Sequence, residues 1–185
     1  RFVDASPWRE KHWRRSFMSV VAVRDSLELC VSFLDSTNAR GSEIESYLTQ
    51  YLLTAVYASF EEEVRGIVGA RSELIDDAEA ANYVRVSLTN VVRGLKIGEL
   101  AGLIGRFSET AKEQFSDAVT NTEAHAAWDS ILNDRHASAH GEGAKLTISD
   151  FARAFDDALS VLEQLASALG IVRAYPRPSR LPAPA

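Results

Sequence analysis

The chain has 185 residues and a mass of 20.3 kDa, with 46% hydrophobic and 25% charged residues. These proportions exclude a disordered chain, and the length suits one soluble domain with a sizeable core. One cysteine, Cys30, excludes an intramolecular disulfide framework and fits a reducing compartment, so we expect a cytoplasmic protein. No apolar run approaches the about 20 residues that a membrane span needs, and no secretory signal is present, so no membrane partner is expected.

The net charge of −6 is unevenly distributed along the chain. The first 24 residues carry six cationic side chains against two acidic ones, a balance of +4, and three arginines follow residue 172. The middle of the chain is therefore acidic and should not bind nucleic acid through bulk charge. A local basic cleft would have to bind RNA or DNA. Alternatively, the basic amino-terminal end is a solvated helix face.

Apolar residues recur at helical spacing through most of the chain, and no segment has the pattern of a strand. A long amphipathic helix is predicted over residues 8–35, with Arg24 on its apolar stripe. Ser42, with Glu45 three residues later, has the pattern of a capping box and starts a second helix over residues 43–68. Two long helices joined by a short loop predict a helical hairpin.

Glu63 falls near the middle of the apolar seam of this second helix when residues are placed about 100° apart. A carboxylate in that position needs a buried partner, because an unpaired buried charge is strongly destabilising.

Shorter helices are predicted over residues 83–95, 96–107 and 108–119. The acidic stretch that precedes these helices, residues 69–82, is interpreted as a solvated first helical turn rather than a metal site. The three glycines between residues 98 and 105 lack the spacing of a phosphate loop, so no nucleotide site is predicted.

Two further helices complete the prediction. One is capped by Asn121 or Thr122, runs to about residue 139 and is stopped by Gly141. The other starts at Thr147, with Asp150 three residues later, and has the cleanest apolar pattern in the chain before it ends at a glycine.

The predicted fold class is all-α, an antiparallel bundle of four main helices with one or two short accessory helices. A single domain is expected over residues 1–172. Residues 173–185 are rich in proline and are predicted to form a flexible tail.

The densest cluster of chemically active side chains lies at the end of the helix that starts near residue 122. On a helical wheel with Trp128 at zero, Arg135 falls at about −20°, in the centre of the apolar stripe. His136 and His140 fall on one flank, at about +80° and +120°. An arginine on an apolar stripe is either paired in the core or projects into a cleft or interface, where its planar fork suits phosphate.

Each of these residues also has a structural interpretation. Arg135 could form a buried salt bridge, for which Glu63 is the candidate partner. His140 could be a helix C-cap, and His136 a partly exposed surface residue.

Other chemistries are less well supported by the residues. Histidines four apart on a helix can share zinc, but no HExxH pattern is present, and no metal is predicted. A catalytic triad through Ser138 lacks a nucleophile elbow. A ligand-binding bundle whose inner pocket is lined by Tyr47, Tyr51 and Tyr57 remains a remote alternative.

The arrangement Arg, polar residue, three residues, His, at the end of a late helix and before a glycine-containing loop, resembles the HEPN superfamily. The matching residues are Arg135, His136 and His140 of RHASAH. The flanking NDRHASAHGEG and LTISDF, with YASFEEEVR at residues 57–65, are most similar to the branch associated with RiboL-PSP-type proteins. The resemblance covers about residues 10–169.

This resemblance implies a metal-independent endoribonuclease, often a toxin or defence effector of toxin–antitoxin systems, that needs no cofactor. Its homodimers would join two copies of the motif in one composite cleft. Arg135 would bind the scissile phosphate of the RNA, and His140 would act as general acid or base. His136 would help to orient the phosphate, although the family commonly has Asn or Asp there.

RNA, a second copy of the chain and an antitoxin or other regulatory protein are the partners that the resemblance implies. Since many HEPN domains are inactive, the alternative is a catalytically inactive HEPN-like module that binds protein or nucleic acid.

Overall fold

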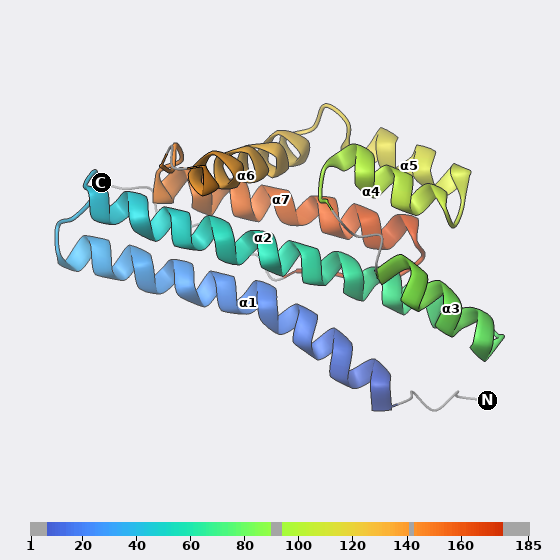
Figure 1. Cartoon of the computed structure of the whole chain (residues 1–185). Helices are drawn as coiled ribbons and strands as arrows, with labels where there is room; N and C mark the ends of the chain where they lie inside the picture. Colours follow the sequence, from blue (N-terminus) through green and yellow to red (C-terminus); the bar gives the residue numbers. More distant parts are fainter. Residues whose placement is uncertain (1–6, 90–93, 141–142, 176–185) are drawn as a thin grey trace.

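The structure, a computed structural model, describes residues 7–89, 94–140 and 143–175, with only the backbone of residues 7–19 and 89. Every regular element in these ranges is an α-helix, which confirms the predicted all-α class (Figure 1). None of these helices is both long and apolar enough to cross a membrane. The helices are α1 (Pro7–Ser36), α2 (Glu43–Ser72), α3 (Ala78–Thr89), α4 (Ile97–Gly105), α5 (Glu109–Val119), α6 (Glu123–Ala139) and α7 (Ile148–Ala168).

The long helices α1 and α2 lie side by side as the predicted hairpin (Figure 1). Helix α2 also packs against α7 and α6, which pack against each other, while α4 and α5 cover the other end of α7. A column of aromatic rings joins the three central helices. The ring of Phe60 on α2 stacks on that of Trp128 on α6, with centroids 4.5 Å apart, and lies 6.2 Å from that of Phe155 on α7. Burial of these large rings is a main source of the apolar stabilisation of the core.

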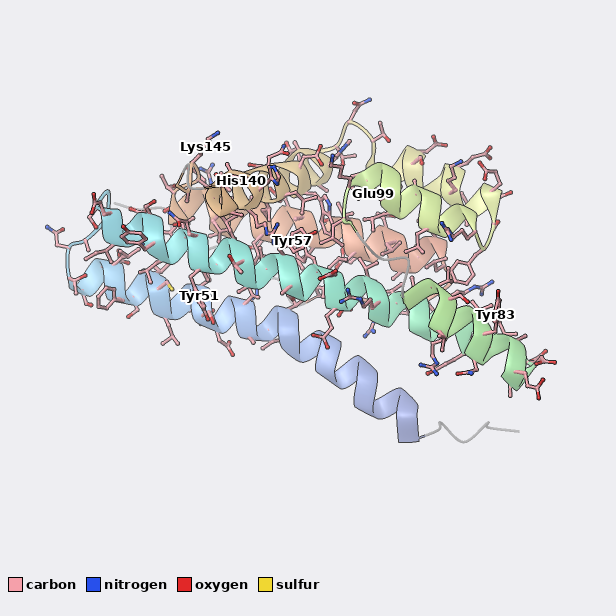
Figure 2. The ribbon with its side chains drawn as sticks, in the orientation of Figure 1. Tyr51, Tyr57, Tyr83, Glu99, His140 and Lys145 are labelled. Atoms are coloured by element: carbon pink, nitrogen blue, oxygen red, sulfur yellow. The ribbon has the colours of Figure 1, made fainter. Side chains whose placement is uncertain are left out.

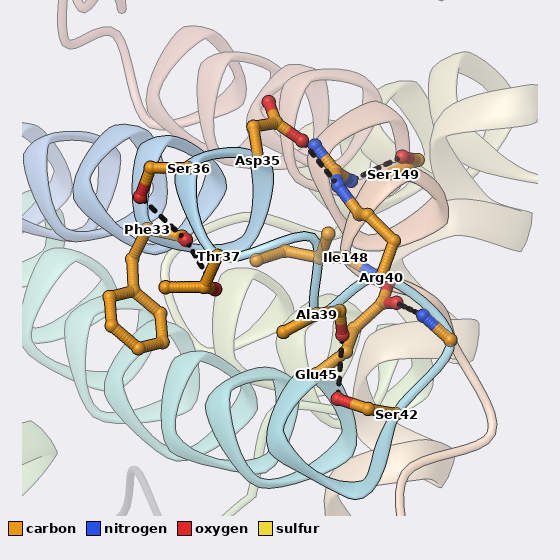
Figure 3. Close-up of polar contacts among 11 residues, drawn as sticks. Phe33, Asp35, Ser36, Thr37, Ala39, Arg40, Ser42, Glu45, Ile148 and Ser149 are labelled. Atoms are coloured by element: carbon orange, nitrogen blue, oxygen red, sulfur yellow. Dashed lines mark hydrogen bonds and ion pairs between the residues drawn. The ribbon is translucent and has the colours of Figure 1, made fainter.

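The start of α2 differs from the predicted capping box. Ser42 occupies the N-cap position, but its hydroxyl donates to the carbonyl of Ala39, at 2.6 Å (Figure 3). The buried carboxylate of Glu45 accepts instead from the backbone N–H of Gly41, at 2.6 Å, and of Ile148, at 3.0 Å. Ile148 is the first residue of α7, so Glu45 satisfies a free amide of another helix and ties the start of α7 to α2.

A second polar contact joins the hairpin turn to α7. The guanidinium of Arg40 donates to Asp35 at 2.8 Å and to the hydroxyl of Ser149 at 3.2 Å (Figure 3). The hydrogen bond from Arg40 lowers the pKa of Asp35 below its ordinary value. Asn38 and Gly41, both with positive φ, let the chain reverse between the two helices.

Arg24, which the sequence places on the apolar stripe of α1, is paired with α7. Its guanidinium bonds to Asp156 at 2.6 Å and lies 5.3 Å from the ring centroid of Phe155. Charge neutralisation and the aromatic face together let an arginine occupy a half-buried site. Cys30 is buried on the same helix, and burial raises the pKa of its thiol, as expected for a structural cysteine.

The middle of the chain shows the largest shift in helix boundaries. Helix α3 begins five residues before the predicted start at residue 83, where the carboxylate of Asp77 accepts from the N–H of Ala80 at 2.8 Å. Leu95 lies outside any helix, although it is buried and its carbonyl accepts from Nε1 of Trp128 at 2.7 Å. Apolar residues at helical spacing can therefore pack from a loop, because burial alone does not require helical backbone.

The ends of α6 and α7 follow the predicted signals more closely. The hydroxyls of Thr122 and Thr147 accept from the backbone N–H groups three residues later, so both predicted caps are confirmed. Gly170, with φ of 70°, follows the last residues of α7, as expected of a helix stop. Gly141, the predicted stop of α6, lies outside the described residues.

Glu63 lies completely buried on α2, as the helical wheel predicted, but its partners come from the segment after α7. The hydroxyl of Tyr175 donates to Oε1 of Glu63 at 2.5 Å, and Nε of Arg173 lies 3.5 Å from the same oxygen. The backbone N–H of Tyr175 also donates to Glu163, at 3.2 Å. The sequence predicts a flexible tail that includes Arg173 and Tyr175. They pack on the domain instead, because Glu63 provides a buried acceptor.

Tyr175→Phe is expected to make the free energy of unfolding change less with pH in the alkaline range. Burial and the charge of Glu63 raise the pKa of Tyr175, whereas an unfolded tyrosine loses its proton at about pH 10. Above that pH the folded state holds more protons than the unfolded state. The free energy of unfolding should therefore fall as pH rises, by about 1.4 kcal/mol per pH unit from this group.

Urea unfolding of both proteins between about pH 8 and 11 measures this difference. The variant should be about 1–3 kcal/mol less stable at pH 8, since Glu63 loses a donor, and the gap should narrow above about pH 10. If the free energies of unfolding of the two proteins changed in parallel with pH, the raised pKa of Tyr175 in the folded state would be contradicted.

Candidate active site on α6

Arg135 lies on α6 where this helix packs against α2. Its guanidinium carbon is 4.4 Å from the ring centroid of Tyr57 on α2, well inside the range of a cation–π contact. Among the described residues, no carboxylate and no hydrogen-bond acceptor contacts the Arg135 side chain. The structural interpretation of a buried Arg135–Glu63 pair is therefore wrong, because Arg173 and Tyr175 occupy the carboxylate of Glu63. The half-exposed guanidinium keeps its N–H donors for an anion.

The two histidines of the cluster lie together at the end of the same helix, and both are exposed. Figure 2 labels His140 on α6. The ring centroids of His136 and His140 are 4.5 Å apart, and the rings meet edge to face. His140 is the C-cap residue of α6, and its backbone N–H bonds to the carbonyls of His136, at 3.3 Å, and Ala137, at 3.1 Å. Two imidazoles, whose ring nitrogens can donate or accept hydrogen bonds, therefore lie side by side at this end of α6.

Asp134 is a residue of this region that the sequence reasoning missed. It is 5% exposed, and its two carboxylate oxygens accept from the backbone N–H groups of Lys145, at 2.8 Å, and Leu146, at 2.9 Å. Ser138 adds a hydrogen bond to the carbonyl of Gly143, at 3.3 Å. These bonds tie the last turns of α6 to the segment that leads into α7. Its position in the sequence could have identified it as buried, because Asp134 lies three residues after the buried Ile131, on the same side of the helix.

Asp134→Ala is expected to destabilise the domain by about 3 kcal/mol, since two backbone donors lose a charged acceptor. Urea unfolding measures the loss, with Asn133→Ala as a control at the exposed neighbouring position. Amide hydrogen exchange of Lys145 and Leu146 should also accelerate in the variant. Unchanged exchange at these two amides would show that Asp134 does not hold the segment.

The tyrosines proposed to line an inner pocket do not lie inside the bundle. Tyr47 and Tyr51 are 66% and 56% exposed, and Tyr57 is half-buried beneath Arg135. The helical wheel could not separate these faces, because α2 is covered on several sides by α1, α6 and α7.

Within residues 7–89, 94–140 and 143–175, no group of three or more His, Cys, Asp or Glu side chains is placed to hold a metal ion. The chemistry that the described residues support is thus that of one guanidinium, two adjacent imidazoles and an aromatic ring. Comparison with protein-family models, with curated proteins and with solved structures found no match for this chain.

Proposed function

We propose that this chain is a HEPN-type, metal-independent endoribonuclease that acts in the cytoplasm as a toxin or defence effector. The observation that carries the proposal is the environment of the Arg135 side chain. Its guanidinium lies over the ring of Tyr57, no described residue uses its donors, and it lies five residues before the exposed His140. In this proposal α1, α2, α6 and α7 are the four main helices of an antiparallel bundle, and the contacts of α2 and α7 with the other two support it.

The proposed reaction uses the 2′-hydroxyl of RNA as its own nucleophile. Arg135 binds the non-bridging phosphate oxygens and stabilises the charge that develops on them. His140 removes the proton of the 2′-hydroxyl or protonates the 5′-oxygen that leaves, and water donates or accepts the other proton. The 2′-oxygen forms a bond to phosphorus as the bond from phosphorus to the 5′-oxygen breaks. The products are a 2′,3′-cyclic phosphate and a 5′-hydroxyl.

His136 has a secondary role in this proposal. Its ring contacts that of His140, so it can orient the phosphate or the His140 imidazole. In the HEPN superfamily, which this chain resembles, Asn or Asp is more common at this position. The N–H of the His136 ring can donate a hydrogen bond to the same phosphate.

A homodimer is part of the proposal for a geometric reason. Residues five positions apart on a helix point about 140° apart, so Arg135 and His140 of one copy diverge. A two-fold axis beside α6 brings Arg135 of one copy close to His140 of the other and forms one composite cleft.

The test is incubation of the purified protein with RNA in the presence of EDTA. Cleavage should leave 2′,3′-cyclic phosphate ends, and RNA of the same sequence with 2′-O-methyl riboses should remain intact. No cleavage of any RNA, or cleavage that EDTA abolishes, would refute a metal-independent ribonuclease.

The second candidate is a catalytically inactive HEPN-like module that binds a protein such as an antitoxin, or nucleic acid. Exposed apolar side chains on the α1–α2 hairpin favour a protein partner, since exposed apolar groups often mark interfaces. Leu29 is 72% exposed and Phe33 48% exposed on α1, and Tyr47 and Tyr51 are exposed on α2. This candidate would be supported if the wild-type protein bound a partner but cleaved no RNA, and if a Leu29→Ser, Phe33→Ser double variant no longer bound that partner.

A further inference from the structure

Tyr57 is the side chain of α2 that meets the candidate site. It is half-buried, and its ring lies under the guanidinium of Arg135, 4.4 Å from centroid to guanidinium carbon. We propose that Tyr57 is a positioning residue that holds Arg135 in the orientation in which it binds phosphate. This inference rests on the proposed function, because it concerns the arginine to which that function assigns the scissile phosphate.

An aromatic partner has a different effect from a carboxylate partner. A carboxylate would bind the N–H edge of the guanidinium and neutralise its charge. The aromatic ring contacts the guanidinium without neutralising it, so the full positive charge remains. No described residue takes its N–H donors, which remain for the phosphate. Arg135 thus loses rotamer freedom before the ligand arrives, which lowers the entropic cost of binding.

The ring of Tyr57, and not its hydroxyl, carries this role. No hydrogen bond to the Tyr57 hydroxyl occurs among the described residues, so phenylalanine should replace tyrosine without loss. Leucine would keep an apolar side chain but remove the aromatic face. Tyr51, six residues earlier on α2 and 56% exposed, has no ring contact in the described part of the chain and provides a matched control.

The first experiment needs no RNA. The Nε–Hε proton of Arg135, assigned by its loss in Arg135→Lys, should be shielded by the ring in the wild type and in Tyr57→Phe. This shielding should disappear in Tyr57→Leu. Titration with inorganic phosphate should shift the same signal, with an affinity about 3- to 10-fold weaker in Tyr57→Leu than in Tyr57→Phe.

The second experiment measures binding of a fluorescein-labelled RNA with 2′-O-methyl riboses by fluorescence anisotropy. The Kd should rise about 3- to 10-fold in Tyr57→Leu and stay within about twofold of the wild type in Tyr57→Phe and Tyr51→Leu. Circular dichroism at each step confirms that the variants are folded.

The inference is overturned if Tyr57→Leu keeps the phosphate affinity of the wild type, or if Tyr57→Phe or Tyr51→Leu loses as much. It is also overturned if the wild type binds neither phosphate nor the modified RNA. Neither ligand is cleaved, so these outcomes are independent of the ribonuclease test. Cleavage of natural RNA decides the proposed function, and the Tyr57 variants decide how Arg135 is held.

Discussion

Arg135→Ala and His140→Ala are each expected to lower the rate of RNA cleavage by about 100- to 1,000-fold. The first variant removes the cation that stabilises the phosphate charge, and the second removes the proton carrier. Arg135→Lys should be only partly active, because lysine keeps the charge but not the planar fork or the contact of the guanidinium with Tyr57. Initial rates on a fluorogenic RNA substrate measure the effect.

Matched controls exist on the same helices. His125→Ala changes a histidine near the start of α6 that lies 3.3 Å from Asp129, and Arg153→Ala changes an exposed arginine of α7 that bonds to Asp150. Both should cleave RNA at close to the wild-type rate. Activity in Arg135→Ala or His140→Ala equal to that of these controls would exclude the proposed roles.

Mixing the two inactive variants tests the composite site. If each site takes Arg135 from one copy and His140 from the other, half of the randomly mixed dimers contain one intact site of two. About a quarter of the wild-type activity should then return after subunit exchange. If each site uses both residues of one copy, no mixed dimer has an intact site and no activity returns.

Trp128→Ala is expected to cause the largest loss of stability, about 4 kcal/mol. Trp128 is completely buried, its ring lies within 2° of parallel to that of Phe60, and its Nε1 donates to the carbonyl of Leu95. The alanine variant would leave a large cavity between α2 and α6 and an unsatisfied carbonyl. Since domains are stable by only about 5–15 kcal/mol, the variant should be close to unfolding at 37 °C.

Trp128→Phe separates the contribution of ring packing against Phe60 from that of the hydrogen bond to Leu95. It keeps an aromatic ring against Phe60 but loses the hydrogen bond to Leu95, so it should cost about 1–2 kcal/mol more than a conservative core exchange. Urea unfolding followed by circular dichroism measures both variants. A Trp128→Ala variant less than about 1 kcal/mol below the wild type would contradict this packing.

Local signals predicted the helices well where the interaction stays within a few residues. The caps at Thr122 and Thr147 depend on a backbone N–H three residues away, and each prediction holds. Glu45 has the same local spacing from Ser42, yet its carboxylate bonds to Ile148, 103 residues later. The spacing alone could not reveal this competing donor, because it arrives only when α7 packs against α2.

The sequence by itself determined the all-α class, the long hairpin, the burial of Glu63 and the presence of Arg135 on an apolar stripe. These features follow from helical periodicity, which local backbone hydrogen bonds impose. Only the tertiary structure decided the partners. Glu63 bonds to Tyr175, 112 residues away, and the guanidinium of Arg135 lies over the ring of Tyr57 on another helix. A buried or half-buried charge takes the partner that packing brings closest, and that choice depends on how distant segments meet.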